Sequence, residues 1–258
     1  MAPLVSIIMP AYNAERYIEQ AIHSIQNQTF TNWELLIVDD LSTDTTVEIV
    51  KHACAKDRRI SIQQLNQNAG TGVARNTALQ KAQGRYIAFL DADDLWREDK
   101  LEKQLAFMQA NNYAFCFSYY DLISSDGIET ETQITAPDSL SFSNMFTSNW
   151  IGNLTAIYDS EAVGNLTIDS ARKRQDWTLW LDILRKVQLA HAIPESLAFY
   201  RIGDQSVSSG KIALLKHNYN VYRKFHKLSI FASLASMVLF LWIHFLVKPV
   251  YIKKLPQK

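Results

Sequence analysis

The chain has 258 residues, of which 48% are hydrophobic and 20% charged, a composition that fits one large globular domain followed by a tail. Its formal net charge is zero, but Asp204 is the last acidic residue and nine Lys or Arg follow it. Since the whole chain is neutral, the body up to Asp204 is acidic, which argues against nucleic acid as a partner. The basic tail after Asp204 favours an anionic membrane surface. The two cysteines, Cys54 and Cys116, lack the spacing of a zinc site or a disulfide framework.

Short β-rich runs alternate with helical patterns over the first 110 residues. Buried strands are predicted at residues 4–10, 33–40, 60–65 and 86–90; no basic leader precedes the first, so we expect a strand there rather than a signal peptide. Helices are predicted near residues 18–25, 42–55 and from 73 onward. This alternation predicts a mostly parallel sheet, in which loops at the carboxyl ends of strands build the ligand site. Residues 10–15, 39–40 and 91–94 all lie at such ends.

The second half of the chain is less regular. Strands are predicted at residues 114–120 and 153–159, with polar loops and short elements over residues 121–148. An amphipathic helix is predicted from Asp176, because five apolar residues share one helical face: Leu179, Trp180, Ile183, Leu184 and Val187. No linker separates the halves, so we expect one continuous domain.

The tail contains 20 residues, 228–247, without a formal charge apart from a possible charge on His244. This length is barely enough to cross a hydrocarbon core. Basic residues lie on both sides of the segment, so the positive-inside rule gives no orientation. A helix lying in the membrane interface, or a shallow hairpin-like insertion, explains two basic flanks better than a simple span does. The alternative is a helix buried in the globular body.

Three carboxylates, Asp91, Asp93 and Asp94, follow the predicted strand at residues 86–90. Burying such groups is costly unless something compensates their charge. Asp91 and Asp93 share a face if the segment is extended, and two carboxylates at a strand end suit Mg²⁺ or Mn²⁺. The alternative is that Asp93 or Asp94 caps the following helix.

Four segments carry a family resemblance in combination: "VSIIMPAYNAERYIEQAIHSI", "WELLIVDDLSTDTT", "NAGTGVARNTAL" and "YIAFLDADDLW"; a fifth, "RQDWTLWLDIL", matches less closely. Together they resemble the inverting nucleotide-sugar glycosyltransferases of family 2. The resemblance implies a GT-A (Rossmann-like) α/β fold with a mostly parallel central sheet flanked by helices. It implies a catalytic domain over residues 1–210, with a donor half at about 1–112 and an acceptor half at about 113–210. Residues 211–258 would form a membrane-associating helical tail.

The resemblance also implies residue roles. Asp176 would be the catalytic base, although Gln175 stands where the family motif usually has Glu. Asp93, together with Asp91, would hold the metal. The nucleotide sugar would contact Pro10, Ala11, Tyr12, Glu15, Asp40, Gly72, Arg75, Asp91 and Ala92. Within this set, Tyr12 would stack on the base, Asp40 rather than Asp39 would accept from the uracil N–H, and Arg75 would neutralise phosphate or hold the acidic motif.

Further roles are implied with alternatives left open. Trp177 would stack on a sugar or simply pack in the core. Residues 200–211, with Arg201 and Lys211, would form a loop that closes over the diphosphate or a solvated loop.

The implied function is a Mn²⁺- or Mg²⁺-dependent transfer from a nucleotide sugar, with a UDP-hexose as the expected donor, to a lipid-linked or cell-surface glycan acceptor. The setting would be polysaccharide biosynthesis at the cytoplasmic face of the bacterial inner membrane, with the protein peripheral or tail-anchored. The alternative is a catalytically degenerate nucleotide-sugar-binding membrane protein. A phosphohydrolase with Asp91 as nucleophile is disfavoured, because such sites want Thr or Val where this chain has Leu95, and lie on the first strand.

Overall fold

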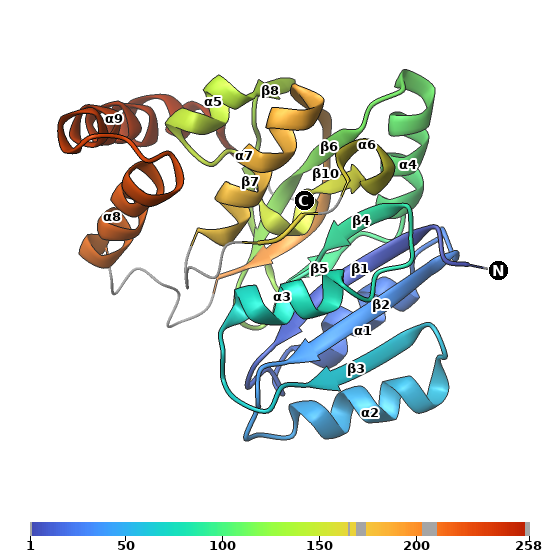
Figure 1. Ribbon diagram of the computed structural model, residues 1–258. Helices are drawn as coiled ribbons and strands as arrows, with labels where there is room; N and C mark the ends of the chain where they lie inside the picture. Colours follow the sequence, from blue (N-terminus) through green and yellow to red (C-terminus); the bar gives the residue numbers. More distant parts are fainter. Residues whose placement is uncertain (1, 165, 169–173, 203–210, 256–258) are drawn as a thin grey trace.

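The computed structural model describes residues 2–164, 166–168, 174–202 and 211–255, and its described strands form a single sheet of 11 strands (Figure 1). The first half supplies four parallel strands in the order β4-β1-β2-β3: β1 (Val5–Ala11), β2 (Trp33–Asp39), β3 (Ile60–Gln64) and β4 (Tyr86–Phe89). Between them run α1 (Ile18–Gln26), α2 (Thr46–Lys56) and α3 (Thr71–Leu79). The predicted alternation and the parallel sheet are confirmed.

The second half extends the same sheet. Its elements are β5 (Leu95–Trp96), α4 (Lys100–Asn111), β6 (Phe115–Ile123), β7 (Glu129–Ile134), β8 (Ser139–Ser141), α5 (Phe142–Thr147), η1 (Asn153–Thr155), β9 (Ile157–Asp159), α6 (Ser160–Val163), α7 (Gln175–Val187) and β10 (Leu189–Arg201). Strand β9 lies antiparallel between β4 and β6, and β10 runs parallel to β6. Residues from both halves are therefore hydrogen-bonded into one sheet.

Two elements of this half differ from the sequence prediction. The strand predicted at residues 153–159 is shorter, because Asn153–Thr155 form a 3₁₀ turn and pairing begins at Ile157. The 13-residue β10 was not predicted. Its pairing with β6 shifts register between Ile193 and Ser196, around Pro194, so the apolar alternation that marks a strand is interrupted there.

Alternate residues of the central strands face two hydrophobic cores. On β1, Ile8 joins the core formed with α3, α5 and α7, whereas Ile7 and Met9 join the core formed with α1 and α4. Neighbouring side chains of a strand point to opposite faces of the sheet. A strand that is apolar at nearly every position therefore needs cover on both sides, as parallel strands of α/β folds usually have.

The tail follows as α8 (Lys211–Asn220), η3 (Val221–Phe225), α9 (Ile230–Trp242), η4 (Ile243–Val247), η5 (Lys248–Tyr251) and β11 (Ile252–Lys254). Figure 1 shows α8 and α9 at the edge of the molecule farthest from β3 and α2. The chain then returns, and β11 pairs antiparallel with β7. Thr135 donates two hydrogen bonds to the Tyr251 carbonyl, from its N–H at 2.8 Å and its hydroxyl at 3.0 Å.

One face of α9 packs on the body while the opposite face is apolar and exposed. Ser233 and Phe240 are buried, and the Phe240 ring lies 5.8 Å from that of Trp177 on α7. The exposed side chains lie on the other face and continue into the next turns: Phe231, Leu234, Val238, Leu239, Trp242, Phe245 and Leu246. In the described chain, Ile230–Tyr251 is the one helical stretch long and apolar enough to cross a membrane, with a mean hydropathy of 2.3. Full burial in the body, the alternative considered above, does not occur, since only 17% of its most apolar window is buried.

Candidate active site

The carboxyl ends of β1, β2 and β4 open into a cleft of about 1100 Å³. Most of the site residues implied by the sequence line it, namely Pro10, Ala11, Tyr12, Asp40, Arg75, Asp91, Ala92, Asp93 and Asp176. Glu15 and Gly72 are not part of the lining. The Glu15 carboxylate accepts hydrogen bonds from the Thr45 N–H and hydroxyl at the start of α2, and Gly72 is buried in the first turn of α3. Their contact with a nucleotide sugar stays a prediction.

Tyr12 lies at the mouth of the cleft, directly after β1, with 51% of its surface exposed. A tyrosine that only packs at the edge of a core would be more covered than this. The exposed ring is therefore free to stack against a planar ligand such as a nucleobase.

Asp40 and Asp39, at the end of β2, have different partners. Asp40 accepts hydrogen bonds from the Ala69 and Gly70 N–H groups at 2.7 and 2.8 Å. Gly70 has a φ of +91°, a conformation that favours glycine, so Asp40 stabilises the turn that opens α3. Asp39 is fully buried and accepts from the Ser42 N–H and hydroxyl. Of the two, Asp40 lines the cleft, and its contact with a uracil N–H stays a prediction.

Arg75 holds the first carboxylate of the acidic motif. Its Nη2 donates to Asp91 Oδ1 at 2.6 Å, and its Nη1 donates to Gln175 Oε1 at 3.3 Å. Asn153 Nδ2 donates to the same Asp91 oxygen at 3.2 Å. Arg75 is only 8% exposed, so these are the contacts of a buried cation. They correspond to the second of its two implied roles, orienting the acidic motif, and they place Gln175 in the same network.

Asp93 and Asp94 have different environments. The Asp93 side chain is exposed at the cleft. The protein around the cleft still partly desolvates its carboxylate, and this effect together with the negative charge of Asp91 raises the pKa of Asp93 to about 6. Asp94 is 2% exposed and accepts a hydrogen bond from the Arg201 N–H at 2.9 Å. Burial, Asp93 and Asp91 raise the pKa of Asp94 well above its ordinary value. Neither residue caps α4, whose N-cap is Asp99, so the capping alternative is wrong.

Asp176 lies half-buried in the first turn of α7 and lines the cleft. Its Oδ2 accepts a hydrogen bond from Asn149 Nδ2 at 2.7 Å. The carbonyl of Asn149 in turn accepts a hydrogen bond from Lys248 Nζ. The carboxylate is therefore oriented by a neighbour that leaves part of it open to the cleft, as a proton acceptor for a bound hydroxyl requires.

Trp177, the next residue on α7, is fully buried. Its Nε1 donates to the Met145 carbonyl at 2.6 Å, and its ring contacts Tyr222 and Phe240. It faces the core, so of the two roles considered for Trp177 the structure selects packing, and stacking on a sugar is wrong.

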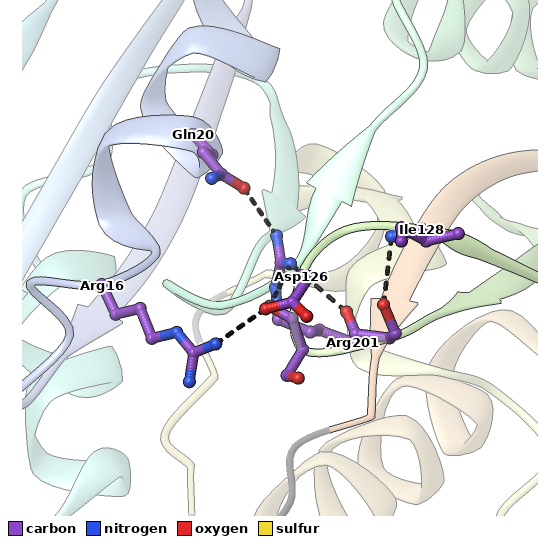
Figure 2. Close-up of polar contacts among 7 residues, drawn as sticks. Arg16, Gln20, Asp126, Ile128 and Arg201 are labelled. Carbon is purple, nitrogen blue, oxygen red and sulfur yellow. Dashed lines mark hydrogen bonds and ion pairs between the residues drawn. The ribbon is translucent and has the colours of Figure 1, made fainter.

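Arg201, at the end of β10, joins three parts of the chain, and Figure 2 shows its contact with Gln20. Its guanidinium donates to the Asp93 carbonyl, to the Ser124 and Ser125 carbonyls, and to Gln20 Oε1. Figure 2 also shows Asp126 of this turn in contact with Arg16.

Because Arg201 is 3% exposed and engaged by these acceptors, it fixes the backbone of the acidic motif instead of reaching over a diphosphate. That part of the closing-loop prediction is corrected. Residues 203–210 lie outside the described part of the chain, so the loop itself stays a prediction.

The far wall of the cleft comes from segments that sequence reasoning missed. Asn149 and Asn153 line it from the second half, and Arg174 lies just before α7. The tail contributes His244, Lys248, Pro249, Tyr251 and Ile252. Nothing in the local pattern of these residues indicates a ligand site, because the return of β11 to β7 is a contact between segments more than 100 residues apart.

Asp91 and Asp93, the two carboxylates that the resemblance assigns to a divalent cation, both line the cleft. Among the described residues, no group of three or more His, Cys, Asp or Glu side chains could hold a metal ion. Mg²⁺ is commonly held by one or two carboxylates, with water and substrate phosphate completing its shell. The pair therefore fits a cation bound together with a diphosphate, which would compensate the repulsion that raises the pKa of Asp93.

Comparison with known proteins places this site in a family. Residues 6–163 match the model of glycosyl transferase family 2. The chain is 45% identical over 226 residues to TuaG of Bacillus subtilis (strain 168), a teichuronic acid biosynthesis glycosyltransferase by name, covering 88% of this chain and 90% of that protein. It is 37% identical over 224 residues to the UDP-Glc:alpha-D-GlcNAc-diphosphoundecaprenol beta-1,3-glucosyltransferase WfgD of Escherichia coli, covering 86% of each.

The fold is also similar to that of a solved structure. The crystal structure of S. aureus TarS 1-349 in complex with UDP-GlcNAc superimposes with a TM-score of 0.74 over 95% of this chain and 74% of that chain, at 21% sequence identity. The shared architecture, the matched family model and the relatives above 30% identity agree with one another. The chain belongs to glycosyl transferase family 2 and is a glycosyltransferase.

Proposed function

We propose that the protein transfers a hexose from UDP to a saccharide carried on a lipid diphosphate, with inversion at the anomeric carbon and with Mn²⁺ or Mg²⁺ bound. The carrying observation is that one cleft contains both the acidic pair, Asp91 and Asp93, and the oriented carboxylate of Asp176. The names of the relatives support both substrates, since WfgD uses a UDP-sugar and an undecaprenol-linked diphosphate acceptor. The alternative, a protein that binds a nucleotide sugar without catalysis, would not need an acidic pair and a base in the same cleft.

The donor would lie along the carboxyl ends of the parallel strands. The exposed Tyr12 ring offers a stacking face for the nucleobase, and Asp40 lies beside it in the cleft lining. The diphosphate would then extend toward Asp93. A divalent cation bound there would neutralise negative charge on the departing diphosphate.

The reaction requires a base on the acceptor side. A hydroxyl oxygen of the acceptor forms a bond to the anomeric carbon while the bond from that carbon to the UDP oxygen breaks. Asp176 accepts the hydroxyl proton, and UDP leaves with the bonding electron pair. Asn149 orients the carboxylate for this transfer through its 2.7 Å hydrogen bond.

The exposed apolar face of α9 would dock on the cytoplasmic leaflet of the bacterial inner membrane. A helix that is apolar all round is normally covered on every side, and no described residue covers this face. Arg223, Lys224 and Lys227 before the helix would attract anionic lipid.

Both ends of α9 are attached to the same body. Tyr222, before the helix, is buried and its hydroxyl donates to the Phe146 carbonyl, while β11, after it, pairs with β7. A helix held in this way cannot cross a bilayer without detaching one end, so we propose that it lies in the interface.

A thermal-shift panel of nucleotide sugars tests the proposed donor. UDP-hexoses with Mn²⁺ should raise Tm by about 5–10 °C at 100 times Kd, because a ligand that binds only the native state stabilises it. GDP- and CMP-sugars serve as controls. The same UDP-hexose should be transferred to a GlcNAc-diphospho-lipid. Transfer at full rate in the presence of a chelator would contradict metal dependence, and a response to every nucleotide alike would contradict the assigned donor.

Vesicle flotation tests membrane docking. The double variant F231S/W242S should lose most of its binding to vesicles containing anionic lipid, because it removes two large apolar side chains from the exposed face. UDP binding should persist. Ile128→Ser is the matched control, since Ile128 is 68% exposed but lies in the turn before β7. Equal flotation of the double variant and this control would contradict docking through α9.

A further inference from the structure

Two cations line the acceptor side of the cleft without a carboxylate partner. Arg174 and Lys248 both belong to the lining, and neither forms an ion pair with any described residue. Arg174 Nε is buried and has no hydrogen-bond partner in the described structure. Asp176 is the carboxylate within electrostatic reach of both cations, so one negative charge faces two positive ones. Enclosed cations are normally paired, so this excess of positive charge indicates a site for an anion.

The electrostatics agree with this geometry. Burial and the nearby Arg174 lower the pKa of Lys248 to about 8, and burial lowers the pKa of Arg174. Lys248 is influenced by Arg174 and Asp176 together, so all three groups lie within electrostatic reach of one another. An anion bound here would therefore lie next to the residue proposed as the base.

The position of Lys248 in the chain indicates what kind of anion fits. Lys248 directly follows η4 near the end of the apolar helical stretch, and Phe245 and Leu246 are exposed less than one helical turn before it. A turn of helix rises about 5.4 Å. A lipid lying along the exposed face of α9 would thus bring its headgroup to Lys248.

The wall that contains Lys248 is built into the fold. Lys248 Nζ donates to the Asn149 carbonyl and lies 5.2 Å from the centre of the Trp150 ring, which also contacts Tyr251. Arg174 has a φ of +67°, a backbone conformation that is unfavourable for a side chain larger than Gly and is retained only where its surroundings impose it. Lys248 is therefore held in place before a ligand arrives.

We propose that Arg174 and Lys248 bind the diphosphate of the lipid-linked acceptor and so position the first acceptor sugar at Asp176. The proposal rests on the proposed function for its choice of acceptor. The donor diphosphate is assigned to the other side of the cleft, at Asp91 and Asp93. The two diphosphates would thus be held by separate groups, the donor's through a cation and the acceptor's through two basic side chains.

Binding of undecaprenyl diphosphate in detergent micelles tests the proposal without requiring turnover. Wild-type protein should bind undecaprenyl diphosphate about tenfold more tightly than undecaprenyl monophosphate, because the second phosphate adds charge-assisted hydrogen bonds. Arg174→Gln and Lys248→Gln should each remove most of this preference while leaving affinity for UDP within about twofold. Lys253→Gln is the control, since Lys253 belongs to the same returning segment but is exposed and outside the cleft lining.

Two outcomes would overturn the proposal. One is that both variants keep the wild-type preference for the diphosphate. The other is that they lose UDP affinity in parallel with it, which would assign the two cations to the donor. If the enzyme transferred no sugar, the proposed function would be contradicted. The binding comparison does not depend on turnover and could still be interpreted.

Discussion

Replacing Asp93 with alanine is expected to lower sugar transfer by at least about 10³-fold, because the departing diphosphate would lose the cation that we propose Asp93 binds. The variant should remain folded. In the wild type, the protein surroundings and Asp91 raise the pKa of Asp93 from 3.8 to about 6. The native state therefore binds this proton more tightly than the unfolded state does, and its stability falls as pH rises through the interval from about 4 to 6.

Removing the Asp93 carboxylate should thus leave Tm at pH 7 unchanged or higher when no metal is present. The additional rise in Tm that Mn²⁺ gives in the presence of UDP should disappear. Asp126→Asn is the matched control, because Asp126 is an exposed acid that pairs with Arg16 outside the cleft lining. A variant that keeps its manganese response, or that unfolds, would mean that Asp93 has a structural role instead.

Asp176→Asn is expected to lower kcat by about 10³-fold, within the range that a positioned general base contributes. Asparagine has nearly the same shape, so α7 and the cleft should keep their geometry. The KM for the UDP-sugar should therefore change little.

Asp182→Asn is the control for this substitution. Asp182 lies on the same helix, forms an ion pair with Arg185 at 2.6 Å and is absent from the cleft lining. It should behave like the wild type. If Asp176→Asn transferred sugar at a normal rate, the base would have to be another group and the assignment from the resemblance would be lost.

The meeting of the strand-end residues in one cleft could be predicted from the sequence because these residues follow local rules. Pro10 lies near the end of β1, Asp40 directly follows β2, and Asp91 lies two residues after the last residue of β4. The carboxyl ends of parallel strands meet at one edge of a sheet. A run of apolar residues, a polar loop and a following helix are all visible within about 30 residues. No long-range contact has to be known to place these side chains together.

The roles of Trp177 and Arg201 could not be predicted from local sequence. Trp177 lies next to Asp176 in the sequence, yet helix geometry sends it into the core against Phe240. Arg201 lies in a stretch of basic and hydroxyl residues that suggests a phosphate-binding loop. In the structure it is the last residue of β10 and binds the carbonyl of Asp93, because the strand carries it beneath the acidic motif.

The sequence by itself determined the parallel α/β sheet, the family, the acidic motif and the amphipathic helix that begins near Asp176. These follow from residue periodicity and from short motifs, whose physical basis is local. Tertiary structure alone decided that the tail returns from α9 to β7 and places Lys248 beside Arg174 and Asp176. The far wall of the cleft depends on segments more than 70 residues apart. Strand pairing and core packing bring these segments together, and no local sequence pattern encodes that.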